Sequence, residues 1–287
     1  MLMIDHRLES TDPRGRRAIP RALRRLVFEV ASWAVCLTVW IGAAQASDGE
    51  AKAQLADLVA AVKAHKKDKD DGQLKGDLDQ AVRIYMDAED DKATRKKVIS
   101  TMVSIGKNSK NKDLVKHMLV TLGQTKDEGA APTVKAYLKQ KNAKKSDDIL
   151  LTAIKVAGTA PQSAYVEPLL KLFEKSKHMG VSAKALESLG SYHAVKNKRE
   201  KIVKVVIETV RKYKPGVKGA EKGFLPGEEA RITGEGARSR WSTLSPIVPK
   251  MMGRLTGNEM YGAKVDDWFT MYDENKRDLD QLFVDDE

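Results

Sequence analysis

Apolar side chains recur at intervals of three and four residues along the chain from Glu50 onward, and this spacing is typical of amphipathic α-helices. No stretch alternates strictly between apolar and polar residues in the way that a half-buried strand does. The pattern therefore predicts an all-α fold. The first three apolar groups are Leu55, Leu58, Val59 and Val62; Leu78, Val82 and Tyr85; and Val98, Ile99, Met102 and Val103.

Capping residues and glycines predict where these helices begin and end. Side-chain oxygens at a helix start accept hydrogen bonds from free backbone N–H groups, and glycine is common where a helix stops. The predicted starts are Asp77, Asp113, Ser146-Asp147-Asp148 and Ser163. The predicted ends are Gly106, Gly123, Gly158 and Gly190.

The helices also repeat as pairs. Pairs that open at Asp77, Lys112, Asp147 and Gly180 follow one another in steps of 35, 35 and 33 residues. A period in this range is typical of an α-solenoid, in which short helical units stack on their neighbours. Segments 118–123, 153–158 and 185–190 can be superposed, and each ends in glycine.

Three segments, HMLVTLGQTKDEGAAPTVKAYLKQ, AIKVAGTAPQSAYVEPLLKLFEK and ALESLGSYHAVKNKREKIVKVVIETV, carry a family resemblance. They resemble HEAT-type repeats, especially the short bacterial variety, and the resemblance covers roughly residues 77–213. It implies stacked antiparallel helix pairs that offer an extended surface to a protein partner. We expect such repeats over residues 47–213.

The N-terminus has the organisation of a secretory signal peptide. Six arginines between residues 14 and 25 precede an apolar stretch at residues 26–44, and Ala44-Gln45-Ala46 supplies the small residues that signal peptidase requires. We therefore expect residues 1–46 to be removed after Ala46 and the protein to be periplasmic or secreted. The alternative is an uncleaved anchor formed by residues 26–44, which would hold the protein at the membrane.

Cleavage would also remove Cys36, the only cysteine of the chain. The mature chain would then form no disulfide and would have neither a catalytic thiolate nor a cysteine-ligated zinc ion.

The composition changes after Tyr213. Residues 214–240 contain six glycines and two prolines, which predicts a flexible linker. Residues 241–287 return to helical spacing, and the run RLTGNEMYGAKVDDWFTMYDENKRDLDQLF resembles the closing module of secreted bacterial HEAT-repeat proteins. We expect a helical cap with an acidic tail, in which Trp241, Trp268, Phe269 and Tyr272 cover the last apolar face.

The sequence contains no motif that indicates a particular chemical reaction. The chain has no nucleophile elbow, phosphate-binding loop, paired-histidine zinc motif or dinucleotide fingerprint. Histidines 65, 117, 178 and 193 fall in different units. We therefore expect no enzymatic activity, no metal and no cofactor. The alternative enzyme class is a HEAT-like lyase of the kind that attaches bilin pigments, or an accessory of one.

Charge is unevenly distributed along the chain. Residues 47–91 contain 7 basic and 12 acidic residues, residues 92–145 contain 14 and 3, and residues 265–287 contain 2 and 9. A basic stripe could attract an anionic partner. Its candidate residues are Arg95, Lys96, Lys97, Lys107, Lys110, Lys112, Lys139, Lys141, Lys144 and Lys145.

These observations predict a non-catalytic, exported scaffold that binds another protein. An anionic envelope polymer or lipid is the alternative partner, and the acidic tail could also fold back on the stripe. Nucleic acid is disfavoured because the protein is expected to be exported and because aromatic residues do not alternate with the lysines. The only aromatic residue among the stripe lysines is Tyr137.

Overall fold

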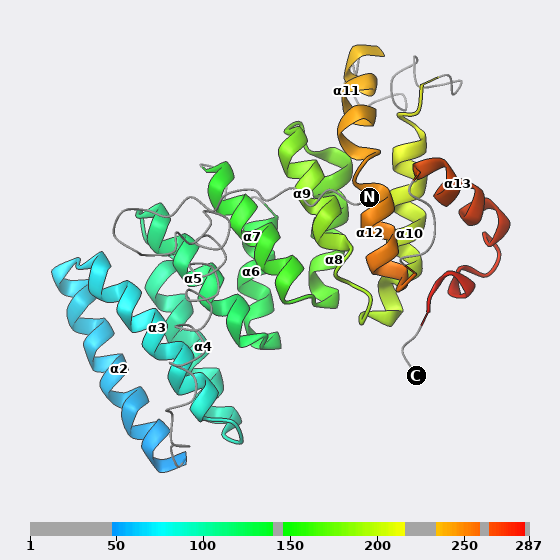
Figure 1. Ribbon diagram of the computed structural model, residues 1–287. Helices are drawn as coiled ribbons and strands as arrows, with labels where there is room; N and C mark the ends of the chain where they lie inside the picture. Colours follow the sequence, from blue (N-terminus) through cyan, green and yellow to red (C-terminus); the bar gives the residue numbers. More distant parts are fainter. Residues whose placement is uncertain (1–47, 140–145, 216–233, 259–263, 285–287) are drawn as a thin grey trace, which may run out of the picture. The chain divides into compact units, whose positions relative to one another are not determined.

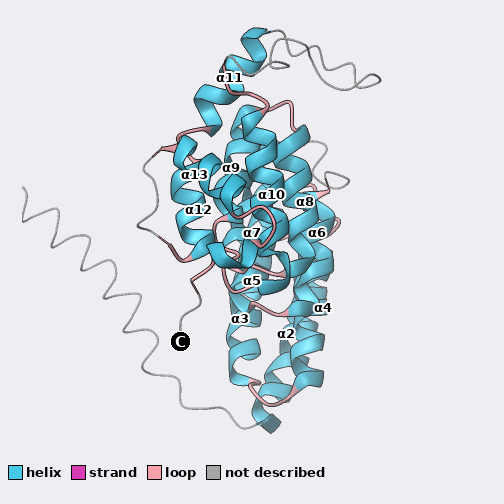
Figure 2. Cartoon of the chain, turned by 90° about the vertical axis from the view of Figure 1, so that its right-hand side faces the viewer, coloured by secondary structure: helices cyan, strands magenta, loops and turns pink. Residues whose placement is uncertain are grey.

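The computed structural model describes residues 48–139, 146–215, 234–258 and 264–284. In these ranges the chain forms twelve α-helices and two short 3-10 helices, with no strand (Figures 1 and 2). The predicted all-α class is confirmed. The predicted signal peptide, with its cleavage site at Ala44 and Ala46 and the alternative anchor at 26–44, lies outside the described residues.

Residues 47–287 form one compact unit. Among the described residues, no helix combines the length and the apolar character that crossing a bilayer requires. The helices are α2 (Asp48–Asp68), α3 (Asp71–Asp87), α4 (Lys92–Gly106), α5 (Lys112–Thr125), η1 (Glu128–Ala130), α6 (Ala131–Leu138), α7 (Asp147–Thr159), α8 (Ser163–Lys175), α9 (Met179–Leu189), α10 (Lys196–Arg211), α11 (Gly234–Leu244), α12 (Val248–Thr256), α13 (Val265–Glu274) and η2 (Leu279–Leu282).

Helices contact others that lie one and two positions away in chain order. Helices α3, α5, α7 and α9 contact one another in that order, and α9 also contacts α11 and α12. In a second series, α2 contacts α4, η1 contacts both α4 and α6, and α6, α8 and α10 follow (Figure 1). Two series of neighbouring helices therefore share a core.

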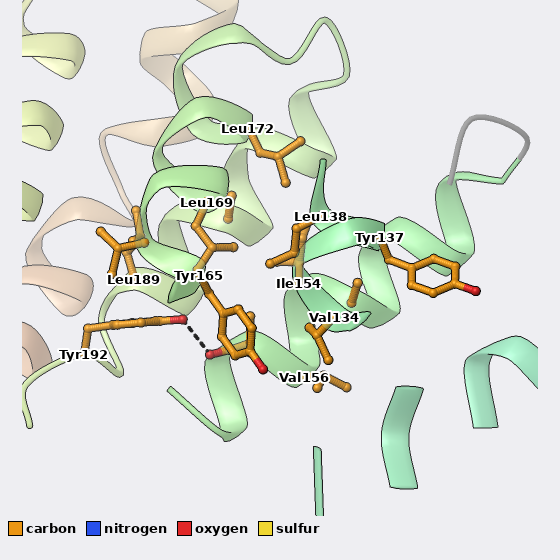
Figure 3. Close-up of a cluster of buried hydrophobic side chains, with 14 of the residues drawn as sticks. Val134, Tyr137, Leu138, Ile154, Val156, Tyr165, Leu169, Leu172, Leu189 and Tyr192 are labelled. Atoms are coloured by element: carbon orange, nitrogen blue, oxygen red, sulfur yellow. Dashed lines mark hydrogen bonds between the residues drawn. The ribbon is translucent and has the colours of Figure 1, made fainter. Parts of the chain in front are cut away.

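The core is formed by leucine, valine, isoleucine and a few tyrosines. Figure 3 shows part of it, where Tyr165 and Leu169 of α8 lie near Ile154 of α7. The hydroxyl of Tyr192 is buried there and donates a hydrogen bond to the carbonyl of Ala157 at 2.9 Å. Burial raises the pKa of Tyr192, so this hydroxyl keeps its proton and remains a donor.

Several predicted helix boundaries agree with the structure. Helix α5 begins at Lys112, α7 at Asp147 and α8 at Ser163, while Gly106 ends α4 and Gly190 follows the last residue of α9. The predicted capping side chains are not the ones that act there: α5 is capped by Asn111 rather than Asp113, and among the described residues no side chain caps α7 or α8.

The predicted start at Asp77 is wrong. Asp77 lies inside α3 and is buried, with its carboxylate 2.8 Å from Nδ1 of His65. The cap is Asp70, whose side chain accepts a hydrogen bond from the backbone N–H of Gln73 at 3.0 Å. Sequence alone could not separate the two aspartates, because the partner of Asp77 lies on another helix.

Gly123 and Gly158 do not end helices, and this prediction is also wrong. Each lies inside its helix, and a Cβ added there would lie 2.7 Å from Val156 or 2.9 Å from Ser188, respectively. A Cβ at Gly190 would lie 3.1 Å from the carbonyl oxygen of Met251. These glycines let consecutive helices of the first series, α5 with α7, α7 with α9 and α9 with α12, approach closely.

The C-terminal helices pack on α9 and α10. Helix α11 begins at Gly234, within the predicted linker 214–240, and residues 216–233 lie outside the described ranges. Trp268, Phe269 and Tyr272 are buried on α13, which contacts α10, and the ring of Trp241 lies 6.3 Å from that of Phe269.

Candidate functional site

The structure divides the predicted basic stripe among several elements. Lys96 and Lys97 are exposed on α4, Lys107, Lys110 and Lys112 lie between α4 and the start of α5, and Lys139 follows α6. The guanidinium of Arg95 lies 4.7 Å from the ring centre of Tyr85. Arg95 therefore packs against α3 in addition to carrying charge. Lys141, Lys144 and Lys145 lie outside the described residues.

A larger cluster of lysines surrounds a hollow between α6, α8 and α10. The hollow has a volume of about 820 Å³, and we call it the lysine trough. Leu138, Leu170 and Leu172 contribute to its apolar lining, together with Pro168 and Val205. The charged lining residues are Lys135, Lys139, Lys171, Lys175, Lys201, Glu167 and Glu174.

A second hollow of about 900 Å³ lies at the beginnings of the same three helices. Its lining includes Lys126, Lys135, Lys196 and Glu128, so Lys135 borders both hollows. The surface over α6, α8 and α10 is therefore recessed along much of its length, and most of its charged lining residues are lysines.

Charge in the lysine trough is only partly compensated. Lys201 of α10 forms an ion pair with Glu167 of α8. Among the described lining residues, Glu174 is the only other acidic one, against five lysines, of which Lys175 is also engaged. Because a recess bounded by protein concentrates the field of its charges, the trough attracts anionic groups more strongly than scattered surface lysines do.

Most of the trough lysines were missed by the sequence analysis. Lys171 and Lys175 belong to residues 146–195, where five basic and five acidic residues cancel, so a count along the chain hides them. A repeated sequence pattern does indicate these lysines, because PTVKAYLK at 132–139 recurs as PLLKLFEK at 168–175. The aromatic residues of both copies, Tyr137 and Phe173, are buried, which supports their equivalence.

His65, His117 and His193 lie in different parts of the structure and have different partners. His65 pairs with Asp77, His117 lies 2.8 Å from Asp79, and Nδ1 of His193 lies 3.0 Å from the carbonyl oxygen of Leu255. In the part of the chain that the structure describes, no three histidine, cysteine, aspartate or glutamate side chains are placed to hold a metal ion.

Comparisons with protein-family models, with curated proteins and with solved structures found no match to this chain.

Proposed function

We propose that this protein is a non-catalytic helical-repeat scaffold that binds another protein over the α6, α8 and α10 surface. The observation that carries this proposal is the lysine trough, a recess across three helices that is lined by five lysines and two glutamates. A broad charged recess suits an extended partner surface better than a small substrate, which needs a deep and mostly apolar pocket.

We propose further that the helices stack as a HEAT-like α-solenoid of antiparallel pairs. Helices α5, α7 and α9 open at Lys112, Asp147 and Met179, close to the predicted step. Each also presents a glycine to the next helix of its series, which supports a repeated packing unit. Such an array builds a long surface from local contacts and is well suited to binding proteins.

Export remains part of the proposal, because a basic, arginine-rich lead and an apolar stretch precede Ala46. Intact-mass measurement of the protein recovered from its source cells tests this part. We expect a chain that begins at Ser47. Recovery of the uncleaved chain from the membrane fraction would support the anchor at residues 26–44 instead.

Protein binding is tested by affinity capture with the tagged chain, at low and at high salt, followed by mass spectrometry. The trough variant carries Lys135→Gln, Lys139→Gln and Lys171→Gln. The control variant carries Lys63→Gln, Lys92→Gln and Lys155→Gln on α2, α4 and α7, and all three of its positions are exposed. Both variants lose three positive charges.

We expect wild type and the control variant to capture one defined protein that survives high salt, and the trough variant to lose it. A protein interface combines ion pairs with buried contacts, whereas salt screens purely electrostatic adhesion. Capture of only anionic polysaccharide or lipid, at low salt alone, would support the alternative function of adhesion to the envelope.

A further inference from the structure

The lysines of the trough form a regular array. Lys135 and Lys139 lie four residues apart at the end of α6, and Lys171 and Lys175 lie four residues apart on α8. Residues with this spacing share a helix face and are separated by about 6 Å along the axis. Helices α6 and α8 contact each other, and packed helices lie about 8–10 Å apart. The four side chains therefore project from two adjacent helices as two parallel pairs.

This array brings like charges together, and the lysine pair occurs twice, once at the end of α6 and once on α8. Lysines on adjacent turns of one helix repel each other. The repeated pattern Pro-x-x-Lys-x-aromatic-x-Lys nevertheless places such a pair on α6 and another on α8. Glu167 is engaged by Lys201 on the α10 side of the trough. On the α6 and α8 side, Lys135, Lys139 and Lys171 face one acidic lining residue, Glu174, so positive charge is in excess there and an anionic occupant would relieve the repulsion.

A helical occupant fits this surface better than an extended one. An extended peptide gains affinity from backbone hydrogen bonds to an exposed strand edge, and the lining of the trough comes from helices and their flanking residues. An α-helix satisfies its own backbone and needs only side-chain contacts. Glutamates four residues apart on one of its faces have the same axial spacing as the two lysine pairs.

We propose that the lysine trough receives an acidic α-helix of the partner protein, which lies along α6 and α8. Its carboxylates, spaced at i and i+4, bind Lys135, Lys139, Lys171 and Lys175. This inference rests on the proposed scaffold function and names the chemistry of the partner.

The test compares two fluorescent, alanine-based peptides of about 20 residues, a length at which such sequences form helices. Both contain the same number of glutamates. In the one-face peptide the glutamates recur at i and i+4, and in the distributed peptide they surround the helix. Fluorescence anisotropy measures the binding of each peptide to the full chain, to the trough variant and to the control variant, with circular dichroism as a check of helix content.

We expect wild type to bind the one-face peptide about tenfold more tightly than the distributed peptide, because only the first presents its charges together. The trough variant should lose about tenfold in affinity for the one-face peptide, and the control variant should stay within about twofold of wild type. The two-peptide comparison on wild type needs no substitution, so a poorly folded variant cannot obscure the result.

Equal binding of the two peptides would overturn the inference, because attraction would then depend on charge alone. Equal losses in both variants would overturn it too, as would tight binding of polyphosphate or of anionic lipid vesicles without binding of the one-face peptide. A captured partner that binds the trough variant normally would overturn this inference and the placement of the partner on the trough, and would leave only protein binding as such supported. Capture of no protein, with one-face binding intact, would instead count against the proposed function alone.

Discussion

Asp127 links residues that are far apart in the chain. Its carboxylate accepts hydrogen bonds from the hydroxyl of Tyr85 at 2.6 Å and from the backbone N–H of Gly129 at 2.6 Å. Its carbonyl accepts one from the side chain of Gln162 at 3.1 Å. A single aspartate thus connects α3, the turn before α6 and the turn before α8.

Tyr85 makes the stability of the fold sensitive to alkaline pH. Burial, together with the hydrogen bond to Asp127, raises the pKa of Tyr85 to about 12. The folded state therefore favours the neutral phenol. Its contribution to stability is complete below about pH 10, the ordinary tyrosine pKa, and is lost as the pH rises through about 12.

Ultraviolet titration of wild type and Tyr85→Phe checks this prediction. We expect the difference between the two curves to show one tyrosine that ionises only near pH 12. Ionisation of Tyr85 near pH 10 in a chain that keeps its helical circular dichroism would contradict the assignment.

Helices α7 and α9 approach each other closely at Gly158, which faces Ser188. We expect Gly158→Val to lower the free energy of unfolding by about 2 kcal/mol, because the new side chain meets Ser188 and overpacks the contact. Gly76→Ala is the control. Nothing lies within 4 Å of a Cβ at Gly76, and alanine inside α3 should raise stability by about 0.5–1 kcal/mol. Urea denaturation measures both, and similar values for the two variants would exclude the close-packing argument.

At the scale of elements, helix caps also serve as links between helices. Asn111 caps α5 by accepting hydrogen bonds from the N–H groups of Asp113 and Leu114. Its side-chain amide donates to Asp71, the first residue of α3, at 2.8 Å. One side chain thus fixes the start of α5 and joins it to α3.

We therefore expect Asn111→Ala to lower the free energy of unfolding by about 1–2 kcal/mol, through loss of the cap and of the bond to Asp71. Asn108→Ala is matched in chemistry, because Asn108 is exposed in the turn before the cap. Its effect should stay within about 0.5 kcal/mol. Chemical denaturation compares the two variants, and equal effects would show that the cap is not a structural link.

Arg211 makes one of several polar links between α13 and the region around the end of α10, the others being Lys214 with Asp266 and Tyr272 with Glu208. The guanidinium of Arg211 donates two hydrogen bonds to the carboxylate of Asp273, at 2.9 and 3.0 Å, and one to the carbonyl of Phe269 at 3.0 Å. It also lies 4.9 Å from the ring centre of Phe269. The bond from Arg211 lowers the pKa of Asp273. The carboxylate therefore supports docking above the ordinary aspartate pKa of about 4 and ceases to do so as the pH falls through its lowered value.

Hydrogen exchange detects loosening of this helix. We expect Arg211→Ala to speed exchange in residues 265–274 by about tenfold and to leave α2–α5 unchanged, because those helices share no contact with the substituted residue. Acidification below pH 4 should produce the same local change in wild type. Uniform acceleration along the whole chain would mean that α13 does not open as a separate unit.

The elements that sequence predicts well are those fixed by neighbouring residues. The start of α5 at Lys112 is fixed by the preceding residue, Asn111, and the helical class follows from apolar spacing. Asp77 and Gly158 were misread because their partners, His65 and Ser188, lie on other helices. Only the packing of those helices shows that the aspartate pairs there and that the glycine permits close approach.

At the scale of the whole molecule, binding surfaces depend on which helices become neighbours. The stripe predicted from chain order includes Lys139 of the trough but not Lys171 or Lys201, which α8 and α10 bring beside it. The charge count along the chain could not find this cluster, since acidic residues nearby in sequence cancel the lysines. The repeated Pro-x-x-Lys-x-aromatic-x-Lys pattern does indicate the cluster, because its two copies lie on α6 and α8, which contact each other.

Photo-crosslinking in the source cells tests whether the trough surface contacts a protein. A photoreactive amino acid replaces Lys171 in the trough or, as the control, Lys155 on α7; both positions are exposed lysines, so each exchange removes one positive charge. We predict that irradiation links one defined polypeptide to position 171 and not to position 155. Equal linking at both positions, or adducts of lipid or polysaccharide alone at position 171, would contradict the scaffold function.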